Sequence, residues 1–320
     1  RFFNWDEYVD PQVLEDFEAE FGIKVIVETF DDENELVSVI QADASRYDLF
    51  SVSDATLYEM AEMRLVAELD HGNIPNLVNI DPAFLDLPND PGNRYSVPYD
   101  WGTTGIAYNT DCVEPEQESW SLLGDPRVAG RVAMDTDFTV VLGSMLKFLG
   151  YPLNSLEPEH IDAAVAALRS LRDEQGLEFI VWAEMLDELA EGELCVIQAF
   201  NGDTGVYMDE YENNGFFVPA EGSDFDLDVL AIPRDALNKA AADLCIDYIL
   251  RPDVHAANNE YTGYAVPNRA AVEGGHVGAE TLSDPVRYPD TAGLEPWQPF
   301  GQETLNLWNR AWADFMADSA

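Results

Sequence analysis

Hydrophobic positions recur with helix and strand periods along the first 65 residues. Apolar side chains return at helical spacing over residues 11–21, and Gly22 follows them, so we expect a helix that ends there. Residues 23–30 are nearly continuous in apolar residues, the pattern of a parallel strand buried on both faces. The other elements expected here are a short strand within 1–8, helices over 33–43 and 54–63, and a strand over 47–53. This alternation predicts a parallel α/β sheet.

A second alternation follows an extended segment over residues 95–110, which carries Gly102 and Gly105. We expect strands over 129–135, 178–182, 193–200, 215–219 and 227–233. We expect helices over 138–150, 159–174, 183–190, 204–213, 236–250 and 302–317, with a turn over 201–203. Because the pattern runs twice, the sequence favours an α/β fold with two lobes between which the chain crosses more than once. Ligand sites of such folds lie at the carboxyl ends of strands and between lobes.

The charge balance excludes several classes of function. The 320 residues include 62 Asp and Glu but only 16 Lys and Arg, for a net charge of −46. Nucleic-acid binding requires clustered cationic side chains, and so does docking on an anionic membrane, so neither is expected. No apolar run reaches the roughly 18 residues that a membrane-spanning helix needs. With 47% hydrophobic residues, the chain has the composition of a folded globular protein.

The acidic residues are spread through the whole chain, whereas lysine occurs only at Lys24, Lys147 and Lys239. A surface this negative repels itself at low ionic strength, and molar salt screens the repulsion. The composition is therefore similar to that of proteins from extreme halophiles; an acidic mesophilic protein is the alternative. Because paired carboxylates arise by chance in such a chain, no Asp or Glu pair by itself indicates acid–base catalysis or a calcium site.

Cysteine and histidine give no sign of a metal or redox centre. Three cysteines leave at least one unpaired, and the apolar runs around Cys195 and Cys245 suggest small buried hydrophobic side chains, with Cys112 apart from both. The four histidines lack metal-ligand spacing. The string Asp224, Asp226 and Asp228 lacks the glycine and terminal glutamate of a calcium loop. We expect no metal and no cofactor.

Seven segments in one order carry a family resemblance. They are FNWDEYV, FGIKVIVETFDDENEL, YDLFSVS, YSVPYDWGTTGIAYN, DVLAIP, RPDVHAANNEYTGYAVPN and EPWQPFG. Together they span essentially the whole chain and resemble the spermidine/putrescine-binding proteins of ABC importers. The resemblance implies a type II periplasmic-binding-protein fold with a hinge of crossing segments and a cleft that closes on its ligand. It implies one lobe of residues 1–106 and 229–275, and another of 107–228 and 276–320.

The resemblance also implies a set of ligand-binding residues. A linear polyamine alternates ammonium groups with methylenes, so its receptor needs aromatic faces, carboxylates, and hydroxyl or amide acceptors. The implied set is Trp5, Asp6, Glu7, Tyr8, Ser53, Asp137, Phe200, Asp203, Asp226, Asp228, Tyr264 and Gln298. In this set Trp5 and Tyr8 form an aromatic wall, and Glu7 meets a terminal ammonium. Asp228 binds an amine, and it lies in an otherwise apolar strand, where a charge needs a partner.

Three positions depart from the family pattern. Val140 stands where the family carries a glutamate, Asp226 where it carries an aromatic ring, and Ala55 where it carries a tyrosine. One carboxylate and two aromatic surfaces are lost, although Asp226 replaces some charge. The same fold binding a mono-amine, an amino acid or an opine therefore stays open beside the polyamine hypothesis.

The function expected from this sequence is that of an extracytoplasmic receptor, periplasmic or on the cell surface, and not an enzyme. It captures a cationic amine by cleft closure and delivers it to an ABC permease as a monomer. A carboxylate-based hydrolase is the distant alternative, since it needs two carboxylates at a fixed separation in one cleft. The sequence lacks the GxSxG, SxxK and HExxH nucleophile and metal motifs.

Overall fold

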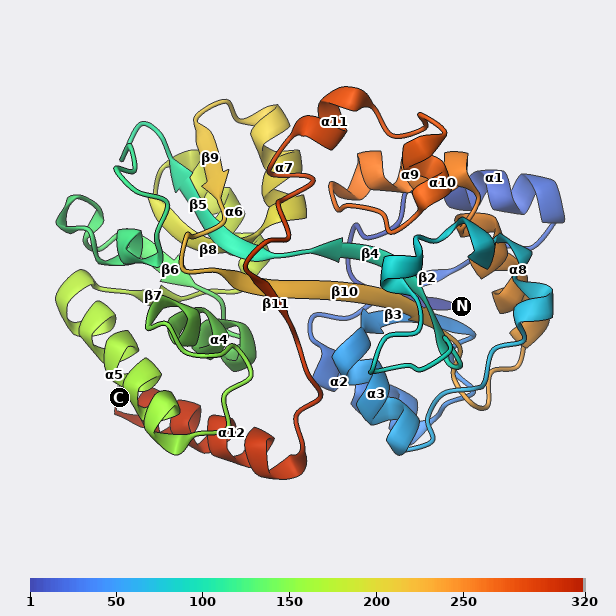
Figure 1. Ribbon diagram of the computed structural model, residues 1–320, viewed down its shortest axis with the longest axis horizontal. Helices are drawn as coiled ribbons and strands as arrows, with labels where there is room; N and C mark the ends of the chain where they lie inside the picture. The colour runs from blue at the N-terminus through green and yellow to red at the C-terminus, as the bar shows by residue number, and fades with distance from the viewer. Residues whose placement is uncertain (319–320) are drawn as a thin grey trace. The chain divides into compact units, whose positions relative to one another are not determined.

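A parallel three-stranded core, β2–β1–β3, lies in the first of two units into which the chain divides (Figure 1). The computed structural model describes residues 1–318. Unit 1 comprises residues 1–101 and 226–283, and unit 2 comprises residues 102–225 and the chain from 284 onward. Within the described chain no helix combines the length and the apolar character that a membrane crossing requires.

Unit 1 is built from strands and helices close to those expected. Its strands are β1 (Phe2–Asn4), β2 (Val27–Thr29), β3 (Leu49–Ser53), β4 (Ser96–Gly102) and β10 (Ser223–Ala231), the last two of which include residues of both units. Its helices are α1 (Pro11–Phe21), α2 (Glu33–Ala42), α3 (Asp54–Glu62), α8 (Lys239–Ile249), α9 (Pro252–Thr262), α10 (Arg269–Glu273) and α11 (Ala279–Ser283). The predicted β-α-β-α-β order of the first 65 residues is confirmed.

The sheet of unit 1 is mixed rather than wholly parallel. Strand β1 pairs with β2 and β3 in parallel, whereas β10 runs antiparallel to β3 and also pairs with β4. The register places Asp228 opposite Ser53. Strands β3 and β10, which lie far apart in the sequence, are therefore neighbours in the sheet. Their pairing brings the side chains around Ser53 close to those around Asp228.

The expectation that residues 23–30 form a strand buried on both faces is wrong. Strand β2 spans only Val27–Thr29, lies at the edge of the sheet, and is half-buried. Ile26 is 47% exposed, while Glu28 accepts hydrogen bonds from Arg46 and Tyr47 at 3.0 and 2.8 Å. An edge strand has one partner only, so its outer face stays in contact with water.

Unit 2 has a five-stranded sheet of order β7–β6–β8–β5–β9. Its strands are β5 (Thr104–Asn109), β6 (Val132–Met134), β7 (Glu178–Phe179), β8 (Val196–Phe200) and β9 (Asn214–Phe217), and β11 (Leu294–Pro296) pairs with the first residues of β10. Its helices are α4 (Phe138–Phe148), α5 (Pro158–Gln175), α6 (Trp182–Glu191), α7 (Asn201–Glu210) and α12 (Gln302–Ala317). Strand β6 is parallel to β8, so both carboxyl ends reach the same sheet edge.

Each unit has its own hydrophobic core. In unit 2, β8 is buried on both faces because Val196 packs in one cluster with Trp120 and Trp308, while Ile197 packs in another with Leu189. In unit 1 the core lies between the sheet and helices α1 and α8; its members include Phe2, Phe17, Tyr99, Ile246 and Tyr248.

Two local predictions near helix starts need correction. The turn expected over 201–203 is the first turn of α7, which begins at Asn201. Helix α9 begins at Pro252, where the sequence analysis had placed only the end of the preceding helix. Proline fits the first turn of a helix because its missing N–H has no intrahelical partner there, so the same residue ends one helix and starts the next.

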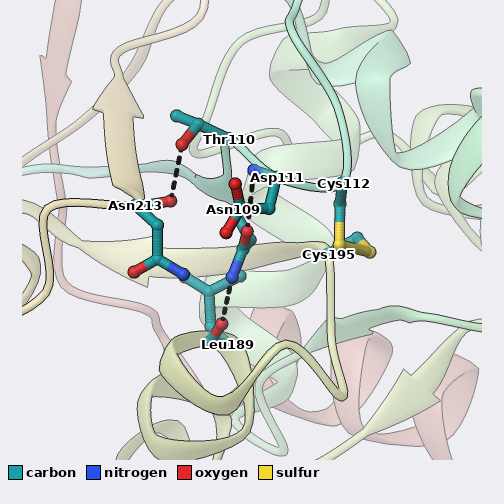
Figure 2. Close-up of a disulfide and its surroundings, with 7 residues drawn as sticks. All are labelled: Asn109, Thr110, Asp111, Cys112, Leu189, Cys195 and Asn213. Carbon is teal, nitrogen blue, oxygen red and sulfur yellow. Dashed lines mark hydrogen bonds between the residues drawn. A yellow bond between two sulfur atoms is a disulfide. The ribbon is translucent and has the colours of Figure 1, made fainter.

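Cys112 and Cys195 form a disulfide, which corrects the interpretation of Cys195 as an unpaired hydrophobic side chain (Figure 2). Cys195 is nevertheless fully buried, and the free thiol of Cys245 is buried as expected. Around the disulfide, Asn109 donates a side-chain hydrogen bond to the Leu189 carbonyl at 2.9 Å. The disulfide therefore ties the end of β5 to the start of β8, two strands that already pair.

Loss of this disulfide should destabilise the protein. It closes a loop of 83 residues, and removing such a link typically costs about 2–4 kcal/mol. We expect Cys112→Ala/Cys195→Ala to unfold at a temperature lower by roughly 5–10 °C in molar KCl, and dithiothreitol to lower wild type by a similar amount.

The control variant is Cys245→Ala, which keeps the disulfide and should still respond to dithiothreitol. A wild-type melting temperature that dithiothreitol leaves unmoved, together with three titratable thiols in the unfolded protein, contradicts the disulfide.

Candidate functional site

A hydrogen bond between Tyr8 and Asp228 is the centre of the candidate site in unit 1. The Tyr8 hydroxyl donates to Asp228 Oδ2 at 2.6 Å across 220 residues of sequence. The Tyr8 carbonyl accepts from the Tyr99 hydroxyl at 2.7 Å, and Asn258 Nδ2 donates to that hydroxyl at 2.9 Å. The segment between β1 and α1 is thus fixed from two sides, and the Tyr8 ring is held against β10.

Two further aromatic rings contact Tyr8. The rings of Tyr99 and Tyr264 lie edge-on to it at centroid distances of 5.7 and 5.4 Å. Trp5, the other aromatic residue predicted for this wall, instead packs on Phe30 at 4.4 Å and is half-buried. Two of the predicted aromatic residues, Tyr8 and Tyr264, therefore meet at Asp228.

Ser53 faces Asp228 in the strand register, but its hydroxyl is already engaged. It donates to Glu33 Oε2 at 2.9 Å, and its oxygen accepts from the Thr56 amide at 3.3 Å as the N-cap of α3. The Ser53 amide also donates to Glu33, at 2.7 Å. Ser53 thus holds a second carboxylate close to Asp228.

Burial and neighbouring acids keep this group of carboxylates poorly ionised. Desolvation raises the pKa of Asp228 to about 7, Glu33 and Asp54 add to the rise, and the Tyr8 hydroxyl opposes it. Desolvation also raises the pKa of Asp54 to about 7, and Glu33 adds to it while Asn89 opposes it. Burial raises the pKa of Asp100 well above its usual range, with Asp228 adding to the rise. Among residues 1–318, no Lys or Arg forms an ion pair with Asp54, Asp100 or Asp228.

Other predicted residues of unit 1 lie at its surface or nearby on β10. The side chains of Asp6 and Glu7 are exposed, in the turn that precedes Tyr8. Asp226 is half-buried and lies two positions before Asp228 on β10. The structure leaves each of their roles in ligand binding as a prediction.

In unit 2, three of the predicted residues lie at or after the carboxyl ends of β6 and β8, and the fourth follows β11. Asp137 is exposed and caps α4 by accepting from the Thr139 amide at 2.7 Å. Phe200 ends β8, and Asp203 lies in the first turn of α7, half-buried. Gln298 follows β11, where its side chain is exposed and its amide donates to Asn154 at 2.8 Å.

Sequence reasoning missed several acids of the candidate site, two of which, Asp100 and Asp135, are buried. Asp135 follows β6, is 6% exposed, and has its pKa raised by burial to about 6, with Asp137 adding to the rise. Asp100, Asp54 and Glu33 were likewise not singled out. The signal for Asp100 was present, since it interrupts the apolar strand segment YSVPYDWG, but the abundance of acids in this chain hid it.

The two sets of side chains are those of a solute receptor. Two α/β units carry carboxylates and aromatic rings at strand ends, which suits a receptor for a small cationic solute. The chain belongs to the family of bacterial extracellular solute-binding proteins, whose model matches residues 12–285.

Relatives and solved structures agree with this assignment. The spermidine/putrescine-binding periplasmic protein of Escherichia coli K12 is 34% identical over 305 residues, which cover 93% of this chain and 85% of the relative. The putrescine-binding periplasmic protein of the same organism is 31% identical, covering 90% and 82%. The solved substrate-binding protein of a spermidine/putrescine ABC transporter from Streptococcus pneumoniae has 31% identity and a TM-score of 0.86, covering 99% and 98%. A solved protein from Listeria monocytogenes reaches 34% and 0.91, covering 98% of both chains. The family resemblance and the two-lobe α/β fold expected from the sequence are confirmed.

The raised pKa of Asp54 predicts how stability depends on pH. Because the folded-state pKa lies above the unfolded value near 4, folding stability falls as pH rises from about 4 to 7 and stays lower above that range. We expect Asp54→Asn to gain on the order of 1–2 kcal/mol over wild type at pH 8 relative to its difference at pH 4. Urea unfolding of both proteins at the two pH values, in molar KCl, measures this.

Asp253→Asn makes the same charge change at an exposed position of unit 1 and serves as the control. If the gain in free energy of unfolding for Asp54→Asn is equal at both pH values, or no larger than that of the control, the pKa of Asp54 is not raised by folding.

Proposed function

We propose that this protein is a receptor outside the cytoplasm for a polyamine of the putrescine/spermidine class. The observation that carries the proposal is the Tyr8–Asp228 pair, together with the absence of an ion pair to Asp54, Asp100 or Asp228 from any Lys or Arg of the described residues. The names of its relatives support the same ligand class.

The chemistry of the group suits an ammonium ligand. An ammonium supplies the positive charge that the buried acids lack and donates up to three charge-assisted hydrogen bonds. The rings of Tyr8 and Tyr264 offer apolar faces for the methylenes and a quadrupole that favours cations. An anionic solute would add to the repulsion among these acids, and a neutral solute would offer no charge to favour their ionised forms.

The candidates in unit 2 supply the means to hold a second ammonium. Asp135, Asp137 and Asp203 are carboxylates near the ends of β6 and β8, and Phe200 adds an aromatic ring. We propose that each unit contributes part of the ligand-binding residues. The lobe boundaries, cleft closure and the individual site residues stay predictions.

The remaining parts of the proposal concern partners. The receptor delivers its amine to an ABC permease, acts as a monomer, and carries out no chemistry on its ligand. A different small solute, such as an amino acid or an opine, is the alternative, since Val140, Ala55 and Asp226 alter the family pattern. A solute panel distinguishes the two.

Calorimetry and thermal unfolding in 2 M KCl, with putrescine, spermidine, spermine, agmatine, γ-aminobutyrate and betaine, test the ligand class. A ligand that binds only the folded state at 100 times its Kd should add about 2.7 kcal/mol to folding stability. We expect saturable stabilisation by putrescine or spermidine, none by betaine, and at least a tenfold loss of affinity in Asp228→Asn.

The control is again Asp253→Asn, which should bind within about twofold of wild type. If an amino acid or opine added to the panel binds while every amine fails, the polyamine proposal is wrong and the family assignment stands. If Asp228→Asn binds the amine as tightly as wild type, the site lies elsewhere.

A further inference from the structure

Asp100 is a buried carboxylate for which this protein provides no partner. It lies on β4 with 0% of its surface exposed, and neither carboxylate oxygen accepts a hydrogen bond from the described residues. Asp90, another buried aspartate of unit 1, shows the contrast. It accepts hydrogen bonds from the Ser96 hydroxyl at 2.8 Å and from the Ser96 amide at 2.9 Å, as well as from two further backbone amides.

A buried carboxyl group without hydrogen-bond partners, such as that of Asp100, lowers the stability of the folded protein. A carboxyl group that is buried without a hydrogen bond loses its bonds to water and gains none in return, and an ionised one loses more. An apolar residue at this point of β4 would avoid the cost. A buried polar group kept at such a cost is often part of a binding or catalytic site.

The neighbours of Asp100 place it in the candidate site. Strand β4 pairs with β10, which carries Asp228. Asp100 is near enough to Asp228, Tyr8 and Tyr99 for its charge to raise the pKa of each tyrosine and for Asp228 to raise its own. Asp100 therefore belongs to the same buried group as the Tyr8–Asp228 pair.

In the described part of the chain, no Lys or Arg forms an ion pair with Asp100 or Asp228. His255 on α9 bonds the Tyr99 carbonyl through Nε2 at 2.7 Å, and burial lowers its pKa to about 4, so it is neutral. Tyr264, which follows α9, adds a phenol beside Tyr8. On α2 and α3, the charged groups that act on Asp228 are the acids Glu33 and Asp54. Within residues 1–318, the groups whose charges act on Asp100, Asp228 and Tyr8 are thus acids and phenols, and the nearby imidazole of His255 is neutral.

We propose that Asp100 and Asp228 together bind one primary ammonium group of the ligand, with Tyr8 holding Asp228 in place. Tyr8 occupies Oδ2 of Asp228, and the two oxygens of Asp100 accept nothing, so acceptors remain for the three N–H donors of an ammonium. This inference rests on the proposed function and deepens it, because it assigns a specificity-determining residue and selects amines with an unsubstituted terminal nitrogen.

Binding of the ligand ammonium between Asp100 and Asp228 should release a proton from these two carboxyl groups. In the free protein, burial raises the pKa of both carboxyl groups, that of Asp228 to about 7, and the charge of Asp228 adds to the rise at Asp100, so the pair retains a proton more readily than exposed carboxylates do. An ammonium that binds both favours their ionised forms and releases that proton to water. Affinity for putrescine should therefore rise with pH between about 6 and 8.

Putrescine titrations of five variants test the inference, in 2 M KCl at pH 7 by calorimetry in two buffers of different ionisation enthalpy. The variants are Asp100→Asn, Asp100→Leu, Asp228→Asn, Asp100→Asn/Asp228→Asn and the control Asp253→Asn. We expect at least a tenfold loss of affinity and a smaller proton release for both single variants of Asp100. The double variant should lose less than the product of the two single losses, because both residues bind the same group.

Tetramethylputrescine provides a second readout, since it keeps both charges but has fewer N–H donors. The affinity ratio of wild type to Asp100→Asn should be smaller with it than with putrescine. The melting temperature without ligand should be unchanged or higher in Asp100→Leu, because the variant removes a buried group without a partner. A purely structural role predicts the opposite.

The results distinguish a ligand-binding role of Asp100 from a structural role and from a failure of the proposed function. If wild type binds putrescine and both variants of Asp100 bind within twofold of it with the same proton release, the inference is wrong and the proposed function stands. If both variants melt lower without ligand and bind like wild type once folded, Asp100 is structural. If wild type binds no primary amine, the proposed function fails and this inference fails with it.

Discussion

A shortage of cationic side chains determines how this protein holds its buried carboxylates. With 16 Lys and Arg for 62 acids, most buried acids must be satisfied by N–H and O–H groups. Glu33 takes the Ser53 amide and hydroxyl, Asp90 takes backbone amides, and Asp228 takes the Tyr8 hydroxyl. Asp100 is the exception within the described residues, and it lies beside Asp228. The shortage of internal cations leaves a place for a cation from outside.

The same constraint predicts that the proposed binding tolerates high salt. Salt at molar concentration shortens the Debye length to about 3 Å, which removes most of the attraction between exposed charges. Asp100 is fully buried, and Asp228 is half-buried and bonded to a tyrosine that lies against two further tyrosine rings, so both are less screened than an exposed carboxylate. An exposed carboxylate such as Glu7 or Asp137 retains much less attraction for an ammonium under those conditions.

Sequence patterns predicted the elements that pack against a core and missed those set by tertiary context. Helix α1 followed from its periodic apolar face and Gly22, while β2 was misjudged because its position at the sheet edge is not visible in its own residues. The family resemblance named Tyr8, Tyr264 and Asp228, which the fold brings together across more than 200 residues. Asp100 was missed although it interrupts an apolar segment, because acids are abundant in this chain and only the pairing of β4 with β10 shows which other acid that segment lies near.

We infer that a ligand ammonium supplies the positive charge that the carboxylates of Asp100 and Asp228 lack. A crystal structure of the protein grown with putrescine in molar KCl tests it most directly. We expect one amine nitrogen to lie within about 3 Å of carboxylate oxygens of both Asp228 and Asp100, with the Tyr8 hydroxyl still bonded to Asp228. Putrescine bound away from Asp228, or a water or K⁺ ion between the two carboxylates while the amine binds elsewhere, would contradict it.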